Sequence, residues 1–256
     1  MRRGILISGI CGRMGSRVAE LVALEPELGL VAGVERADHL CAGGSITVHG
    51  GSVKVFAGFS AAVPAAELVV DFTSPRGTRE ALAFCVERRI PLVTGTTGHT
   101  EEDVRSLKDA AGRIPLLVSP NMSAGVTLLD GILPDVLRMA GDECDVEIVE
   151  KHHRAKKDSP SGTAIRLAET LAESAGARGR NIVVHSVRAG DVVGEHTVIF
   201  GLRGERIEIK HVAESRDCFA HGTIAVVKFL LDKAPGWYSM NDVIVSPSAV
   251  KRKELG

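Results

Sequence analysis

The chain has 256 residues, of which 45% are hydrophobic, so it can bury one large core or two of ordinary size, and we expect two domains. Its 31 Lys and Arg residues nearly cancel its 32 Asp and Glu residues, giving a formal net charge of −1. This balance excludes the strong positive field that draws nucleic acids or anionic membranes. We therefore expect a small-molecule ligand, no nucleic-acid partner and no membrane partner.

The cysteines are widely spaced, at positions 11, 41, 85, 144 and 218, and no Cys-x-x-Cys pair occurs. We interpret them as free thiols of a reducing compartment and expect no metal site. The first apolar run ends at Gly9, which is too short for a signal peptide, and no stretch approaches the roughly 18 apolar residues of a membrane span. A cytoplasmic location is the expectation.

The first half of the chain alternates short β-branched runs with helical periodicity, which is typical of a parallel sheet flanked by helices. A strand is predicted at 5–8, then a helix in which Met14, Val18 and Leu21 share an apolar face, then a strand at 30–34. Further strands are predicted at 68–70, 91–94 and 114–118, and helices at 78–89 and 100–111. The pattern indicates a Rossmann-like domain.

From about residue 122 the rhythm changes. A long helix is predicted at 124–139, interrupted by Pro134, and a second at 164–173. Strands are predicted at 146–149, 182–187, 197–200 and around 207–209, and we expect the apolar run 224–231 to cover one face of this sheet. The predicted fold class is α/β: an N-terminal Rossmann-like parallel sheet domain plus a smaller α+β domain with a mixed, mostly antiparallel sheet.

Glycines 9, 12 and 15 lie between the first predicted strand and helix, where backbone N–H groups can approach a pyrophosphate. The spacing G-x-x-G-x-x-G departs from the usual G-x-G-x-x-G, so a plain glycine-rich turn stays an alternative. Glu35 ends the second strand and could accept hydrogen bonds from a ribose. Arg36 could instead bind a 2′-phosphate or be a solvated charge, which leaves NADH and NADPH both open.

Three more loops, at 71–74, 95–98 and 119–122, each follow a predicted strand. Any one of them could be an ordinary turn. In an open α/β sheet the carboxyl ends of the strands form the ligand crevice, so we expect all three loops to line the same cleft as the glycine turn.

Basic side chains are concentrated at 150–156, where the sequence reads E-K-H-H-R-A-K. His152 and His153 close a predicted strand and point to opposite faces, so we expect different roles and no shared metal ion. Isolated histidines are more often structural, and we interpret His39, His49, His99, His185 and His221 in that way.

A loop enters a helix at 161–163, and its residues are Ser161, Gly162 and Thr163. The N-terminal amides of that helix, with the two hydroxyls, form a pocket suited to a carboxylate. Ordinary N-capping is an alternative that is compatible with ligand binding. A hydrolase nucleophile is disfavoured because no G-x-S-x-G motif surrounds Ser161.

The block 150–164, E-K-H-H-R-A-K-K-D-S-P-S-G-T-A, resembles the signature of the dihydrodipicolinate reductase family, also called 4-hydroxy-tetrahydrodipicolinate reductase. The resemblance covers nearly the whole chain. Its other motifs occur in order: G-R-M-G at 12–15, D-F-T at 71–73, G-T-T-G at 95–98, P-N-M at 120–122, G-E-H at 194–196, I-E-I-K-H at 207–211 and S-R-D-C-F-A-H-G at 215–222. Ser159 stands where the family usually has Ala.

The resemblance implies a reductase of lysine and diaminopimelate biosynthesis that uses NADH or NADPH. It implies His152 as proton donor, Lys156 as a second catalytic or substrate-binding cation, and a substrate dicarboxylate held by His153, Ser161, Gly162 and Thr163. The cofactor-binding residues that it implies are Gly9, Ile10, Cys11, Gly12, Arg13, Met14, Gly15, Glu35, Arg36, Phe72, Gly95, Thr96, Thr97, Ser119, Pro120, Asn121 and Met122. It also implies a homotetramer, with domains at 1–123 plus 234–256 and at 124–233.

Two alternatives remain open. Another two-domain NAD(P) enzyme, such as an aspartate or homoserine dehydrogenase, would share the glycine turn but lack the combination of His152, His153, Lys156 and 161–163. A nucleotide-sensing regulator would bind the cofactor without turnover, although it has no evident need for cations beside an anion pocket.

Overall fold

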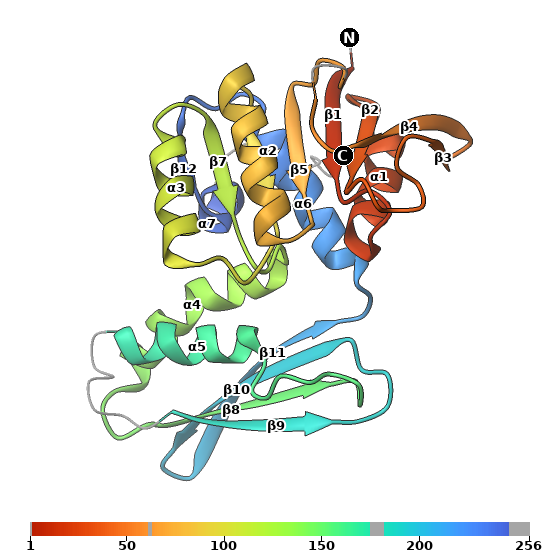
Figure 1. Ribbon diagram of the computed structural model, residues 1–256. Helices are drawn as coiled ribbons and strands as arrows, with labels where there is room; N and C mark the ends of the chain where they lie inside the picture. Colours follow the sequence, from red (N-terminus) through yellow and green to blue (C-terminus); the bar gives the residue numbers. More distant parts are fainter. Residues whose placement is uncertain (1, 61–62, 175–181, 246–256) are drawn as a thin grey trace, which may run out of the picture. The chain divides into compact units, whose positions relative to one another are not determined.

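The computed structural model describes residues 2–60, 63–174 and 182–245 (Figure 1). Contacts divide it into two compact units, one formed by the residues up to Met122 together with those from Phe219 onward, and the other by Ser123–Cys218. The first boundary lies beside the one predicted at 123. The second lies before the predicted position 234, because the helix at 217–230 packs in the first unit from residue 219 onward. Among the residues described, no helix is long and apolar enough to cross a membrane.

The first unit is built on an eight-stranded sheet with the order β12-β7-β6-β5-β1-β2-β4-β3. Its pairs are parallel except the β3–β4 hairpin. In chain order its elements are β1 (Arg3–Ser8), α1 (Arg13–Leu24), β2 (Leu28–Glu35), β3 (Ser45–Val48), β4 (Gly51–Ala57), β5 (Leu68–Asp71), α2 (Pro75–Arg88), β6 (Leu92–Thr94), α3 (Glu101–Ala111), β7 (Pro115–Val118), α6 (Asp217–Leu230), β12 (Gly236–Tyr238) and α7 (Met240–Val245). The Rossmann-like prediction is confirmed.

The sheet of the first unit is covered by helices on both faces, which is why its central strands read as unbroken apolar runs. Successive residues of β1 point to opposite faces: Ile5 and Ile7 join the core cluster that includes α1 and α6, and Leu6 joins the cluster that includes α2 and α3. All three side chains are fully buried. The sheet is thereby fixed between two hydrophobic layers.

Helix α6 belongs to the first unit from Phe219 onward. Val226, Val227 and Leu230 pack in the same core cluster as Ile5 and Val18. The prediction that the run 224–231 covers the second sheet is therefore wrong, because an apolar run shows that a helix is buried but not against which sheet. The strand that follows it, β12, pairs in parallel with β7 and extends the first sheet.

The segment between β2 and β4, which the sequence left unassigned, is a series of tight turns followed by a hairpin. Strand β4 runs parallel to β2, with Gly33 opposite Val55, and β3 folds back on β4. The turns are held by backbone hydrogen bonds, including His39 N–H to the Arg36 carbonyl at 3.0 Å and Gly43 N–H to the Val55 carbonyl at 2.9 Å. The hairpin therefore anchors residues 36–44 beside the end of β2.

The second unit has a four-stranded sheet in the order β11-β10-β8-β9. Strand β10 is antiparallel to both β11 and β8, and β8 is parallel to β9, so the sheet is mixed and mostly antiparallel, as predicted. Its elements are α4 (Ala124–Ala140), β8 (Asp145–His152), α5 (Gly162–Glu173), β9 (Val183–Arg188), β10 (Gly194–Leu202) and β11 (Glu205–Ala213). Helix α4 continues through Pro134, contrary to the predicted interruption. Helices α4 and α5 share one core cluster with the sheet.

Candidate functional site

The loops at the carboxyl ends of neighbouring strands of the first sheet meet around one buried carboxylate. Asp71 is fully buried at the end of β5, and its oxygens accept hydrogen bonds from four hydroxyl groups. The donors are Thr73 at 2.6 Å, Thr78 at 2.6 Å, Thr94 at 2.8 Å and Thr96 at 2.9 Å. The loops that follow β5 and β6 are therefore tied together, as the predicted cleft requires.

The predicted cofactor residues of these loops lie at the same edge of the sheet. A Cβ atom added to Gly95 would lie 2.0 Å from Cε1 of Phe72, so the Phe72 ring rests directly on that glycine. Thr97 is exposed, and Ser119 N–H donates to the Thr94 carbonyl at 3.0 Å. Beyond Ser119, Pro120 is exposed, Asn121 is half-buried and Met122 is buried.

The glycine turn requires its glycines. Gly9 has a φ of +79° and donates its N–H to the Val34 carbonyl at 2.9 Å. A Cβ atom on Gly15 would lie 2.0 Å from the Gly9 carbonyl oxygen, so α1 begins directly against the turn. No side chain caps α1, whose N-cap residue is Gly12. The backbone N–H groups at this helix start therefore suit a pyrophosphate, as a dinucleotide-binding site requires.

Other predicted residues of this turn differ in how they can act. Ile10 is fully buried in the core, where its side chain fills the space beside Gly33, so only its backbone can face a ligand. Arg13 is exposed and Met14 is half-buried. Glu35 is 9% exposed, and its carboxylate accepts the Cys11 N–H at 2.8 Å, so it fixes the turn. Arg36 is a surface residue that pairs with Asp38 at 3.1 Å.

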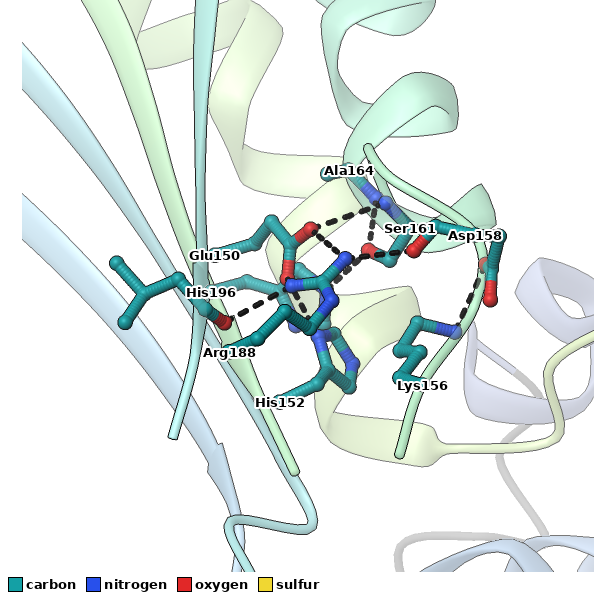
Figure 2. A network of polar contacts seen from close by, with 9 residues as sticks. Glu150, His152, Lys156, Asp158, Ser161, Ala164, Arg188 and His196 are labelled. Atoms are coloured by element: carbon teal, nitrogen blue, oxygen red, sulfur yellow. Dashed lines mark hydrogen bonds and ion pairs between the residues drawn. The ribbon is translucent and has the colours of Figure 1, made fainter. Parts of the chain in front are cut away.

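In the second unit a buried carboxylate organises the end of β8 (Figure 2). Glu150 is fully buried, and Arg188 binds it in a bidentate manner, with distances of 2.8 and 2.7 Å. Glu150 also accepts the Ser161 N–H at 3.1 Å and contacts His152 Nδ1 at 2.5 Å. Glu150 and His152 share a face because they are two residues apart, and Arg188 lies opposite His152 in the parallel β8–β9 pair.

The charge state of this group follows from its contacts. Burial would raise the pKa of Glu150, but the hydrogen bonds from Arg188 and His152 outweigh it and lower that pKa to about 2. An ionised carboxylate only accepts hydrogen bonds, so His152 Nδ1 must donate and Nε2 is the nitrogen left to exchange a proton. Burial lowers the pKa of His152, although Glu150 opposes this effect.

Two further histidines lie beside His152, and sequence reasoning did not assign them a role. His196 and His211 stand opposite each other on β10 and β11, and the ring centroids of His152 and His196 are 5.2 Å apart. His196 Nε2 is 3.1 Å from Ser161 Oγ, and His211 Nε2 is 3.4 Å from Ser123 Oγ. Burial and the neighbouring His152 lower the pKa of His196 to about 4, so it is neutral at pH 7. The signal available in the sequence was that these histidines occur in the motifs G-E-H at 194–196 and I-E-I-K-H at 207–211.

The predicted substrate residues are partly brought together. Ser161 is buried and caps α5 by accepting the Ala164 N–H at 3.2 Å, while Gly162 is exposed and Thr163 is half-buried. Lys156 Nζ pairs with Asp158 at 2.8 Å, with its side chain 21% exposed. His153 is half-buried and is not part of the network in Figure 2. Arg188 is the residue for which the sequence offered no signal.

Comparisons with known proteins agree with this architecture. The model of the family described as "Dihydrodipicolinate reductase, N-terminus" matches residues 3–122, and that of its C-terminus matches residues 125–244. A protein of Syntrophobacter fumaroxidans named 4-hydroxy-tetrahydrodipicolinate reductase is 39% identical over 262 residues, covering 93% of this chain and 97% of the relative. One of the same name from Chromobacterium violaceum is 38% identical, covering 95% and 99%.

A solved structure, the dipicolinate-bound dihydrodipicolinate reductase of Paenisporosarcina sp. TG-14, has the same fold with a TM-score of 0.78. It is 24% identical, and the match covers 94% of this chain and 99% of that one. Both family models together span nearly all the residues of the two units, and the relatives match over nearly their full length. The chain therefore belongs to the dihydrodipicolinate reductase family of oxidoreductases.

Proposed function

We propose that the protein reduces 4-hydroxy-tetrahydrodipicolinate (dihydrodipicolinate) to tetrahydrodipicolinate with NADH or NADPH, in lysine and diaminopimelate biosynthesis. The observation that carries this proposal is the buried His152, whose Nδ1 is engaged by the Glu150 carboxylate and whose Nε2 is left for chemistry. A positioned imidazole with a pKa near or below neutrality is suited to giving a proton to a reacting carbon.

The residues of the first unit fit a dinucleotide. The backbone N–H groups at the start of α1 would hold the pyrophosphate, and Gly9 and Gly15 keep the space that it needs. Glu35 and Arg36 would lie near the adenosine ribose, and the loops that contain Phe72 and Thr96 would hold the other end. When bound, the nicotinamide supplies a hydride.

The second unit would bind the substrate and supply the proton. Loss of water from the 4-hydroxy compound gives the conjugated imine ring of dihydrodipicolinate, to which the reduction adds one hydride and one proton. His152 Nε2 would give the proton to the carbon beside the one that takes up the hydride. The amides that begin α5, at Gly162 and Thr163, would bind one carboxylate, and Lys156 and His153 would add positive charge or hydrogen bonds. Ser161 would act mainly by fixing the start of the helix, since its hydroxyl caps α5 and contacts His196.

We also propose a cofactor preference, an oligomeric state and a cellular location. Arg36 is exposed and could bind a 2′-phosphate as readily as Glu35 could bind a ribose, so we propose use of either cofactor. Val183, Val187 and Val212 lie on the face of the second sheet away from the core cluster and are 37%, 38% and 45% exposed, so this face would contribute to a homotetramer. We further propose that the protein acts in the cytoplasm.

Oxidation of NADH or NADPH tests the proposed function and is monitored as a loss of cofactor absorbance. The unstable substrate is made in situ by the synthase that precedes this step. We expect absorbance to fall only when the protein, the synthase and its substrates are all present. A folded protein that binds the cofactor, as seen by nicotinamide fluorescence, but gives no loss of absorbance would contradict the proposal and favour a nucleotide sensor.

The Lys156→Ala variant should bind substrate less tightly and turn over more slowly, because a cation beside a dicarboxylate acts in both the ground state and the transition state. We expect KM to rise and kcat to fall, each by about tenfold or more, as for the loss of a charge-assisted hydrogen bond. The control is Lys157→Ala, which removes an exposed cation next to it in the chain. Equal kinetics for the two variants would remove Lys156 from the site.

A further inference from the structure

Three side chains with sulfur and nitrogen donor atoms converge at the glycine turn of the first unit. They are Cys11, His39 and Cys41, and one donor atom from each lies within 4.8 Å of the others. All three residues are half-buried. The reductase reaction proposed above gives no role to His39 or Cys41.

The backbone holds the three residues in place without any bound ion. Cys11 donates its N–H to Glu35 at 2.8 Å, which fixes the turn on which it lies. His39 N–H donates to the Arg36 carbonyl at 3.0 Å, and Gly44 N–H donates to the Cys41 carbonyl at 3.2 Å. The Cys41 N–H donates to His39 Nδ1 at 3.2 Å, which places the imidazole beside the second cysteine. This bond must give way when the ring binds an ion, because a neutral imidazole has a single nitrogen lone pair. A donor set held in this way loses little conformational entropy on binding an ion.

The chemistry of the donors selects the ion. Thiolate and imidazole groups are the ligands that Zn²⁺ prefers, and in a tetrahedral site with Zn–S bonds of about 2.3 Å the sulfur atoms lie about 3.8 Å apart. The donors of this cluster need to close by no more than about 1 Å to reach that separation. Two thiolates would also balance the charge of a divalent cation. Carboxylate-binding ions such as Mg²⁺ would find no suitable ligand among the three.

We propose that Cys11, His39 and Cys41 form a binding site for a thiophilic divalent cation, Zn²⁺, with the fourth coordination position left to water. The site would join the glycine turn to the segment 36–44. A disulfide between the two cysteines would use only two of the three donors and leave the position of His39 without explanation. Metal uptake would release the thiol protons to solvent, because the thiolate is the form that binds.

The test uses Co²⁺ as a spectroscopic probe for Zn²⁺, added to the reduced full-length protein without cofactor or substrate. We expect one equivalent to produce the visible bands of tetrahedral Co²⁺ and a thiolate charge-transfer band, and Zn²⁺ to abolish both. The Cys41→Ser variant should lose the charge-transfer intensity of one thiolate and bind at least tenfold more weakly, and His39→Ala should also bind at least tenfold more weakly. Cys218→Ser, which removes a half-buried cysteine outside the cluster, should behave as the wild type.

A second readout guards against variants that fold poorly. Zn²⁺ should raise the Tm of the wild-type protein and of Cys218→Ser but not that of Cys41→Ser, because an ion that binds only the folded state stabilises it. The proposal is overturned if one equivalent of Co²⁺ gives no tetrahedral bands, or if the bands survive unchanged in Cys41→Ser. Since no reaction is measured, a failure here leaves the reductase proposal intact, and a failure of the reductase assay leaves this one intact.

Discussion

The His152→Ala variant is expected to lose a factor of about 10² to 10⁴ in kcat while its affinity for the nicotinamide cofactor stays unchanged. The loss follows from geometry. His152 is only 8% exposed, its Nδ1 is engaged by Glu150, and Nε2 is the one nitrogen of the ring left to give a proton. Initial rates at saturating substrate give kcat, and cofactor fluorescence gives the dissociation constant.

The dependence of kcat/KM on pH provides a second signature of His152. Burial lowers its pKa from the ordinary value of 6.5, so the protonated, proton-giving form is present at low pH and is lost as pH rises through that lowered pKa. We expect kcat/KM to fall over this range in the wild type and in Lys156→Ala, but not in His152→Ala. His185→Ala, which removes an exposed histidine of the neighbouring strand β9, is the control and should keep the wild-type kcat. A normal kcat in His152→Ala would refute the assignment.

The Glu150→Gln variant is expected to lower the free energy of unfolding at pH 7 by about 2 to 3 kcal/mol, because it removes the counter-charge of the half-buried Arg188 guanidinium. The Glu150 side chain is fully buried and the Arg188 side chain is 19% exposed. Glutamine keeps the shape of the side chain but cannot accept two charge-assisted hydrogen bonds. Urea unfolding, followed by circular dichroism, measures the difference.

The sign of the pH effect on Glu150 is opposite to that on a histidine. Its pKa is about 2 in the folded protein against an ordinary 4.5, so the stability that it contributes is fully present above pH 4.5 and is lost as pH falls towards 2. The stability difference between wild type and Glu150→Gln should therefore shrink as pH falls through this range. The fall of kcat/KM with rising pH should also move to lower pH in the variant, because Glu150 raises the pKa of His152.

Glu147→Gln is the matched control for this prediction. Glu147 lies on the same strand, with its side chain 47% exposed, and pairs with His185 at the surface. Exposed ion pairs of this kind contribute about 0 to 1 kcal/mol, so little stability should be lost. If Glu150→Gln were as stable as Glu147→Gln and kept the wild-type pH profile, Glu150 would have no part in holding His152.

Local patterns in the sequence were enough to predict most elements of both units. The centre of strand β1 is an apolar run because both faces of its sheet are covered. Helix α3 could be predicted from its capping residue Thr100 and its acidic first turn. The partner of α6 could not be predicted, because periodicity gives the apolar face of a helix and not the sheet against which it packs. Helix α4 continues through Pro134 because tertiary packing outweighs the local cost of proline.

The candidate site, too, could be predicted from the sequence only in part. The density of basic residues at 150–156 pointed to a site, and the family resemblance implied the roles of His152 and Lys156, which stay predictions. The contact between Arg188 and Glu150 depends on the parallel register of β8 with β9, which joins residues 38 positions apart and leaves no local trace. The cluster of Cys11 with His39 and Cys41 arises in the same way. Widely spaced cysteines suggested no metal site, since only the turns at 36–44 bring them together.

The hydroxyl network around Asp71 has a consequence for which ligand groups the loops can recognise. A threonine hydroxyl has a single proton, and those of Thr73, Thr78, Thr94 and Thr96 are all directed to the Asp71 carboxylate. Thr78, Thr94 and Thr96 are also buried, and the oxygens of Thr94 and Thr96 already accept backbone N–H groups, so these hydroxyls hold the loops and leave ligand contacts to other groups. The network around Asp71 therefore acts on recognition indirectly, by fixing the course of the backbone that the loops present at this edge of the sheet.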